Sequence, residues 1–93
     1  MNKEKVVENI RIKASFDVDH NSTYYYYYIE SLLDSSILHV GNGSANYEMN
    51  EDEMDKDIRN LGREFVETSR YRKHILKQIN SRKIVGDENQ GEA

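Results

Sequence analysis

Hydrophobic and polar residues alternate strictly over residues 10–18, and this alternation predicts the first element of the chain. The even-numbered positions are apolar, and the odd-numbered positions between them are polar. A period of two is typical of a strand with one buried face. Five consecutive tyrosines at 24–28 follow a short cluster of turn-forming residues, and tyrosine favours strands. The pattern therefore predicts a β-hairpin with strands near 10–19 and 23–31.

The register of this hairpin follows if Asn21-Ser22 forms its tip. Val18 then lies opposite Tyr25, and the apolar side chains of both strands gather on one face. Lys13 lies opposite Glu30, which makes a favourable cross-strand charge pair. A slip of one residue would lose both features, so we expect the register that keeps them.

The same register turns every second tyrosine away from the core, because side chains alternate across a strand. Tyr24, Tyr26 and Tyr28 face outward, beside Asp17 and Asp19. Tyrosine is enriched at interfaces because it combines a large apolar area with a hydroxyl group. These five residues are therefore predicted to contact a partner.

A second hairpin is predicted around Asn42-Gly43, the preferred central pair of a type I′ turn. Its strands are expected near 36–40 and 45–49. The connection over 31–36 fits either the end of a strand plus a turn or a single helical turn.

After Met49 the apolar period changes to about 3.6 residues, which is typical of a helix. Asn50 and Glu53 have the spacing of a capping box. The apolar stripe comprises Met54, Ile58, Leu61 and Phe65 and resumes at Ile75, Leu76 and Ile79. A helix over 51–80 would be about 45 Å long, against about 27 Å for an eight-residue strand. The helix therefore either breaks near Thr68-Ser69 or projects beyond the sheet and buries its last apolar residues elsewhere, for instance in a second subunit.

These elements predict an α+β fold. We expect a small antiparallel β-meander of three to four strands with a C-terminal helix, broken or bent near residue 68, packed on one face. Residues 1–85 form one domain, and the polar tail over 86–93 is expected to be disordered. The residues expected in the core are Phe16, Val18, Tyr27, Ile29, Leu38, Ile58, Leu61 and Phe65.

The composition of the chain excludes several classes of protein. The 93 residues include no cysteine, which excludes disulfides and thiolate metal sites and fits a cytoplasmic location. No stretch is apolar enough for a membrane span or a secretion signal. The net charge is −4, but the charges are unevenly distributed along the chain. Positions 16–57 contain ten carboxylates and one lysine, whereas positions 58–83 contain eight basic groups and two acidic ones. We therefore expect surfaces of both signs.

Catalytic and metal motifs are absent from the sequence pattern. Asp17, Asp19 and Asn21 resemble the start of a calcium-binding EF-hand loop, but Ser22 replaces the required glycine and Tyr28 the closing glutamate. The three histidines have no metal-ligand spacing, and no nucleophile stands beside a base. The acidic group Glu51, Asp52 and Asp55 suits a helix N-terminus. We expect no enzyme activity, no metal and no cofactor.

The preferred interpretation is a small non-enzymatic protein-binding module. Its exposed tyrosines would occupy a basic surface on a host or phage protein, together with an acidic rim formed by Asp17, Asp19, Glu51, Asp52 and Asp55. In size, charge and architecture the chain resembles phage-encoded inhibitors, including some anti-CRISPR proteins. That resemblance covers no specific motif and implies an inhibitory role.

Two alternatives remain open. A nucleic-acid-binding module would use a basic helix face formed by Arg59, Arg63, Arg70 and Lys77, with tyrosines stacking on bases. The net charge and the aspartates beside the tyrosines disfavour it. A structural homodimer would instead bury the outward tyrosines between two subunits.

Overall fold

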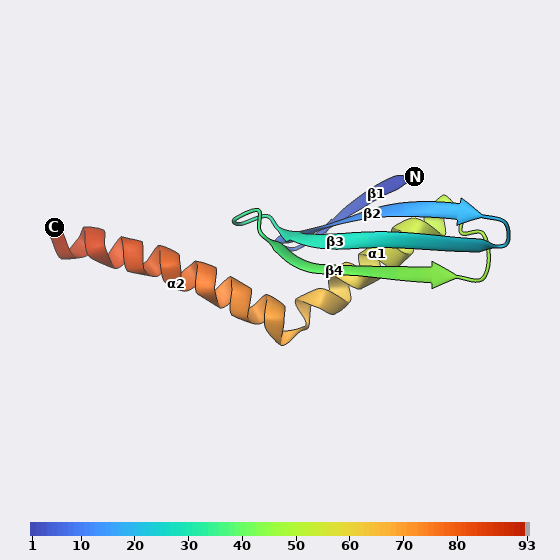
Figure 1. Cartoon of the computed structure of the whole chain (residues 1–93). Helices are drawn as coiled ribbons and strands as arrows, with labels where there is room; N and C mark the ends of the chain where they lie inside the picture. Colours follow the sequence, from blue (N-terminus) through green and yellow to red (C-terminus); the bar gives the residue numbers. More distant parts are fainter. Residues whose placement is uncertain (93) are drawn as a thin grey trace.

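The structure is a computed structural model that describes the backbone of residues 1–92 and the side chains of residues 1–81. Four antiparallel strands form one sheet in sequential order, and two helices follow. Figure 1 shows α1 lying against one face of the sheet and α2 leaving at the end that carries the β3–β4 turn. The predicted α+β meander with a C-terminal helix is confirmed. The elements are β1 (Asn2–Val7), β2 (Ile10–Asp19), β3 (Ser22–Ser31), β4 (Ile37–Ala45), α1 (Glu51–Val66) and α2 (Ser69–Glu92).

Strand β1 was missed by the sequence prediction. It pairs antiparallel with β2 through a tight turn in which Glu8 has a φ of 50°. Its period-two pattern is hidden because Lys3 and Lys5, not apolar residues, lie on the helix side beside Val7. Both lysines reach acidic groups of α1, so charge complementarity replaces hydrophobic burial there.

The predicted register of the β2–β3 hairpin is wrong by two residues. Val18 pairs with Thr23 and Phe16 with Tyr25, and the tip is His20-Asn21, where Asn21 takes a φ of 59°. Asparagine tolerates this left-handed conformation better than most residues. A shift of two keeps every side chain on its expected face, so the predicted parity of the tyrosines is confirmed.

The predicted second hairpin is also wrong. Residues 37–45 form the single strand β4, which pairs with β3, and no strand covers 46–49. A type I′ turn needs positive φ at both central residues, and Gly43 does not have it. The glycines serve another purpose: a Cβ on Gly41 would lie 2.6 Å from the ring of Tyr27, and one on Gly43 would collide with Tyr25. The connection before β4 is a turn rather than a helical turn, with Ser35 at a φ of 64°.

The core lies between α1 and the sheet, mainly over β1 and β2. Gly62 permits this close approach, because a Cβ there would lie 2.5 Å from Ile12 Cδ1. Of the predicted core residues, Phe16, Ile29, Ile58 and Phe65 are buried, and Tyr27, Leu38 and Leu61 are half-buried against the core. Val18 is 41% exposed, because it lies near the β2–β3 tip, which extends past the start of α1 in Figure 1.

The helical region begins where the capping box predicted, and of the two alternatives left open at Thr68-Ser69 the structure has the break. Asn50 caps α1 in a complete capping box with Glu53. The helix ends at Val66, and α2 starts after Thr68, whose Oγ1 accepts the Tyr71 N–H at 3.3 Å. The Thr68 side chain therefore caps the second helix. The tail predicted over 86–93 falls where side chains are not described, and its disorder stays a prediction.

Candidate protein-interaction surface

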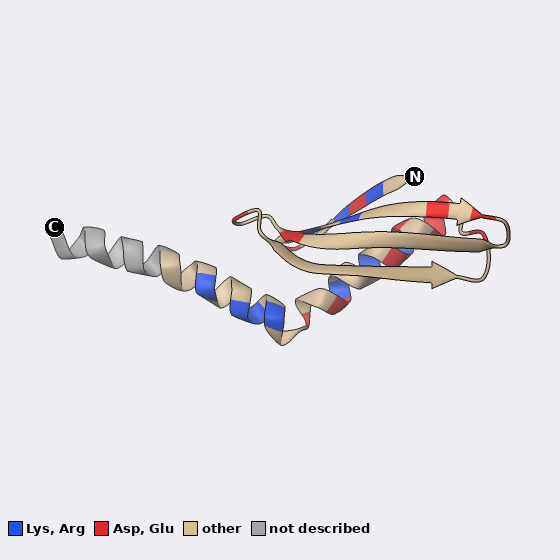
Figure 2. Ribbon diagram, in the orientation of Figure 1, with Lys and Arg blue, Asp and Glu red and all other residues tan. Residues whose placement is uncertain are grey.

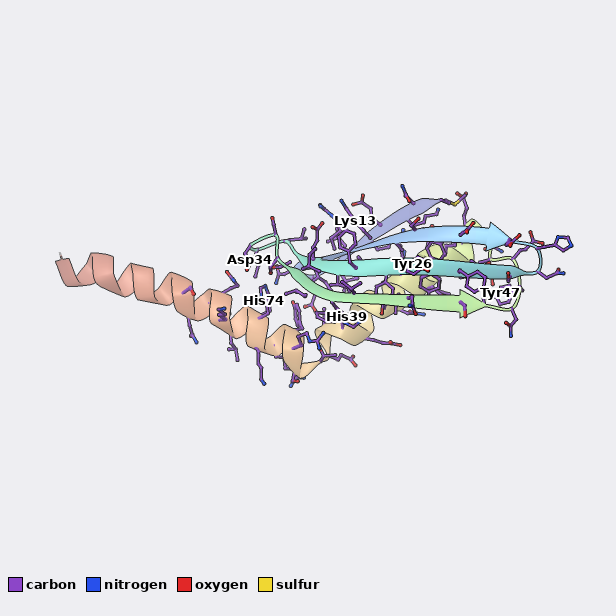
Figure 3. The ribbon with its side chains drawn as sticks, in the orientation of Figure 1. Lys13, Tyr26, Asp34, His39, Tyr47 and His74 are labelled. Carbon is purple, nitrogen blue, oxygen red and sulfur yellow. The ribbon has the colours of Figure 1, made fainter. Side chains whose placement is uncertain are left out.

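One face of the sheet has no helix over it within the described residues, and we call it the open face. The side chains on it are fixed by strand parity and by the pairing of the four strands. Figure 3 shows Lys13 and Tyr26 on the sheet. The open face comprises Asn2, Glu4, Val6, Arg11, Lys13, Ser15, Asp17, Tyr24, Tyr26, Tyr28, Glu30, Ile37, Val40, Asn42 and Ser44.

The β3–β4 half of the open face is aromatic and aliphatic. Tyr26 and Val40 are each 70% exposed, Tyr24 is 55% exposed and Ile37 54%. Tyr28 is half-buried and pairs with Val40. Tyr26, Tyr28, Ile37 and Val40 border a shallow hollow of about 820 Å³. Contiguous exposed apolar groups of this kind mark interaction sites on soluble domains.

Charged residues on the β1–β2 half of the open face border that apolar region on one side. Arg11 is held between two carboxylates, with Nε 3.2 Å from Glu4 Oε2 and Nη1 3.3 Å from Glu30 Oε1. Lys13 lines the hollow beside them. Asp17 lies directly opposite Tyr24 on the neighbouring strand, near the hairpin tip. Asp19 adds a further exposed carboxylate there, so the rim carries more acidic than basic groups.

The acidic residues of α1 lie on the other side of the sheet. Glu51 Oε1 is 3.4 Å from Lys3 Nζ, and Asp55 Oδ1 is 3.5 Å from Lys3 Nζ and 3.9 Å from Lys5 Nζ. Asp52 is exposed in the same helical turn. The structure therefore brings Asp17 and Asp19 together with the tyrosines and separates Glu51, Asp52 and Asp55 from them.

The four residues of the basic helix face are divided between two helices. Arg59 and Arg63 are exposed on α1, and Lys77 is exposed on α2. Arg70 Nη1 contacts His39 Nδ1 at 3.1 Å and donates to the Leu38 carbonyl at 3.3 Å. Figure 2 shows basic groups along the first turns of α2 and acidic groups at the β2–β3 tip. The basic groups of α2 therefore lie far from the acidic groups of the β2–β3 tip.

A polar cluster that sequence reasoning missed joins α2 to the β3–β4 turn. His74 Nε2 lies 2.8 Å from Ser31 Oγ and 3.8 Å from Asp34 Oδ1, and Gln78 Nε2 donates to Asp34 Oδ2 at 2.9 Å. Figure 3 shows Asp34 and His74 near one another. Hydrogen bonds from the Ser36 hydroxyl and backbone N–H, with the nearby His74, lower the pKa of Asp34. No sequence motif marks this cluster, since its residues lie 43 and 44 positions apart.

The cluster superficially combines the residue types of a serine hydrolase triad. A triad needs the carboxylate on the imidazole nitrogen opposite the serine. Here Ser31 and Asp34 both face His74 Nε2. Ser31 is also 1% exposed, and its Oγ accepts the Leu33 N–H at 3.1 Å. These contacts dock α2 on the sheet.

The inward tyrosines belong to a row of aromatic rings beneath β3 and β4. Phe16 and Tyr25 have ring centroids 4.7 Å apart, and burial raises the pKa of Tyr25. The row continues at centroid distances of 5.8–6.3 Å through Tyr27, His39, Phe65 and Tyr71. It therefore links β2, β3 and β4 to both helices.

Comparison with known proteins found no matching family model, no similar curated sequence and no similar solved structure. Within the described residues, no three His, Asp or Glu side chains are grouped to hold a metal ion. None of the helical segments described has the length and apolarity to cross a membrane.

Proposed function

We propose that the protein is a non-enzymatic module that binds another protein through its open face. The observation that carries the proposal is the uncovered tyrosine row, in which Tyr24 is 55% and Tyr26 70% exposed beside Val40 at 70%. Because these side chains stay largely in water, they add little hydrophobic stabilisation to the domain itself. A partner that covers them gains large aromatic contacts of the type found at binding hot spots.

The partner that this surface fits has a basic contact region. Glu4, Asp17, Asp19 and Glu30 lie at the rim, and Arg11 is already paired with two of them. Arginine or lysine side chains of a partner would meet carboxylates at the rim and tyrosine rings at the centre, where cation–π contacts add attraction. Such a partner is expected to associate faster at low salt.

An inhibitory role, as the resemblance to phage-encoded inhibitors implies, would follow if this partner surface is itself a functional site. A cytoplasmic host or phage protein with a basic binding groove is the partner class we propose. Nucleic acid is disfavoured because phosphates would meet the acidic rim of the open face.

The test compares three baits in affinity capture: the wild type, the triple variant Tyr24→Ser, Tyr26→Ser, Tyr28→Ser, and the control Tyr47→Ser. Tyr47 is 50% exposed but lies after β4, off the open face. A protein retained by the wild type and the control but lost from the triple variant supports the proposal. Equal retention by all three folded baits contradicts it.

A salt titration separates the nucleic-acid alternative. Binding of a labelled duplex or single strand that weakens steeply with salt, and less steeply after Arg59→Ala with Arg63→Ala, would assign function to the basic helix face. We expect no tight binding of either probe at physiological salt.

A further inference from the structure

The two edge strands of the sheet differ in how they are protected. The β1 edge carries three consecutive charged residues at positions 3–5, whereas β4 has none in its nine residues. Charged side chains on an edge discourage pairing with another chain, and a long uncharged edge favours it. Within the described residues β4 pairs with β3 alone. The β4 edge is therefore open to another strand.

The free part of this edge can be located. A register shift interrupts the pairing of β4 near its start, and Arg70 donates to the Leu38 carbonyl there at 3.3 Å. From His39 to Ala45 the pairing with β3 is regular. The stretch available to a further strand therefore covers most of β4, centred on Asn42.

The residues at this centre are symmetric about Asn42. Gly41 and Gly43 flank it, and both lack side chains that would hold a second backbone away. The outer ends of the Tyr27 and Tyr25 rings lie over these two glycines on the helix side. Their hydroxyl groups therefore lie above the centre of β4.

We propose that β4 pairs antiparallel with β4 of a second copy, about a two-fold axis at Asn42. Asn42 then lies opposite Asn42 of the other copy, and Gly41 lies opposite Gly43. Side chains stay on matching faces in this register. An amide side chain has both donors and an acceptor, so two asparagines can bond to one another across the axis. Because the strand is uncharged, two identical copies do not repel one another along it.

This pairing creates an eight-stranded sheet with both open faces on the same side. The tyrosine rows remain uncovered, so a partner can still reach them, although Asn42 belongs both to the open face and to the edge contact. Both outer edges of the new sheet are β1 strands, which carry Lys3, Glu4 and Lys5. Those charges stop further addition, and the assembly closes as a dimer.

Cysteine cross-linking tests the register directly, because the chain contains no cysteine. In the proposed dimer the two Asn42 Cα atoms are roughly 4.5–5.5 Å apart, within disulfide range. Asn42→Cys should form a covalent dimer under mild oxidation. Ser44→Cys places the two sulfurs roughly 13 Å apart along the strands. Its yield of covalent dimer should not exceed the background yield of Val6→Cys on the opposite edge. Equal cross-linking of all three variants would overturn the proposal.

Sedimentation equilibrium tests the contact without a covalent bond. The wild type should show a concentration-dependent dimer, and Asn42→Lys or Asn42→Asp should each weaken it by more than about tenfold, because like charges meet at the axis. An equimolar mixture of the two variants should restore association. A wild type that remains monomeric at all concentrations overturns the proposal. Loss of the dimer in Tyr26→Ser but not in Asn42→Lys also overturns it, since the open face would then be the subunit interface.

Discussion

The tyrosine run shows how one residue type fulfils two roles in adjacent positions. Tyr25 packs on Phe16 with ring centroids 4.7 Å apart, and both Tyr25 and Tyr27 lie over glycines of β4. Tyr24 and Tyr26 point the opposite way and are 55% and 70% exposed. Strand parity alone separates the two pairs. The covered face therefore stabilises the fold, and the open face is the one for which we propose a role in recognition.

The largest expected effect tests whether the covered face is one continuous core. Phe65 is 7% exposed and lies between His39 and Tyr71, at centroid distances of 6.0 and 6.3 Å. Phe65→Ala should lower the free energy of unfolding by about 3–5 kcal/mol, measured by urea denaturation. A nearly neutral result would mean that the aromatic row does not couple α1 to β4 and α2.

A matched pair of substitutions measures the difference between the two faces within one strand. Tyr25→Ser removes a half-buried ring and its contact with Phe16, and should cost about 2–3 kcal/mol. Tyr26→Ser removes an exposed ring and should change the free energy of unfolding by less than about 0.5 kcal/mol. Chemical denaturation of both variants provides the measurement. Similar costs would show that the open face also contributes to stability, as expected if a partner subunit covers it.

Gly62→Ala tests how closely α1 approaches the covered face. Alanine favours a helix over glycine by up to about 1 kcal/mol, but its Cβ would lie 2.5 Å from Ile12 Cδ1 and 2.8 Å from Val7 Cγ2. Overpacking typically costs about 1–3 kcal/mol, so we expect a net loss of about 1 kcal/mol in thermal or urea denaturation. A stabilised variant would indicate a looser contact between α1 and the sheet.

The sequence was sufficient for features set by local chemistry. The capping box at Asn50, the apolar stripe of α1 and the parity of residues 24–28 all depend on near neighbours in the chain, and each appears as predicted. The open face could thus be anticipated from parity before its surroundings were known. The weak point at Thr68 was also visible, because the apolar stripe is interrupted there.

Features set by distant contacts were not predictable in the same way. Strand β1 depends on Lys3 and Lys5 meeting acids of α1 about fifty residues later. The glycines of β4 match a turn signal, although Tyr27 and Tyr25 across the sheet explain them better. One sequence signal could have predicted this contact. Gly41 and Gly43 are two positions apart, as are Tyr25 and Tyr27, which is the spacing of residues on one face of a strand. The cluster that docks α2 through His74 left no pattern in the sequence.

The smallest expected effect concerns that docking cluster, where the covered face ends and α2 begins. The pKa of Asp34 is lowered from its ordinary value of 3.8, first by the Ser36 hydrogen bonds and further by His74. A carboxyl whose pKa is lowered by folding stabilises the native state above its unfolded pKa, and this contribution is lost as pH falls through the folded pKa. Asp34→Asn should therefore be slightly less stable than the wild type at neutral pH.

The difference between Asp34→Asn and the wild type should shrink as pH falls below about 3.8, because the wild-type carboxyl then becomes neutral as well. Thermal denaturation from pH 7 to pH 3 measures it, with Asp17→Asn on the open face as the matched control. Asp17 is exposed and makes no side-chain hydrogen bond to residues 69–81 of α2, so its variant should track the wild type. If the stability difference between Asp34→Asn and the wild type does not change with pH, the asparagine destabilises the protein for steric reasons. The charge of Asp34 then has no part in holding α2 against the sheet.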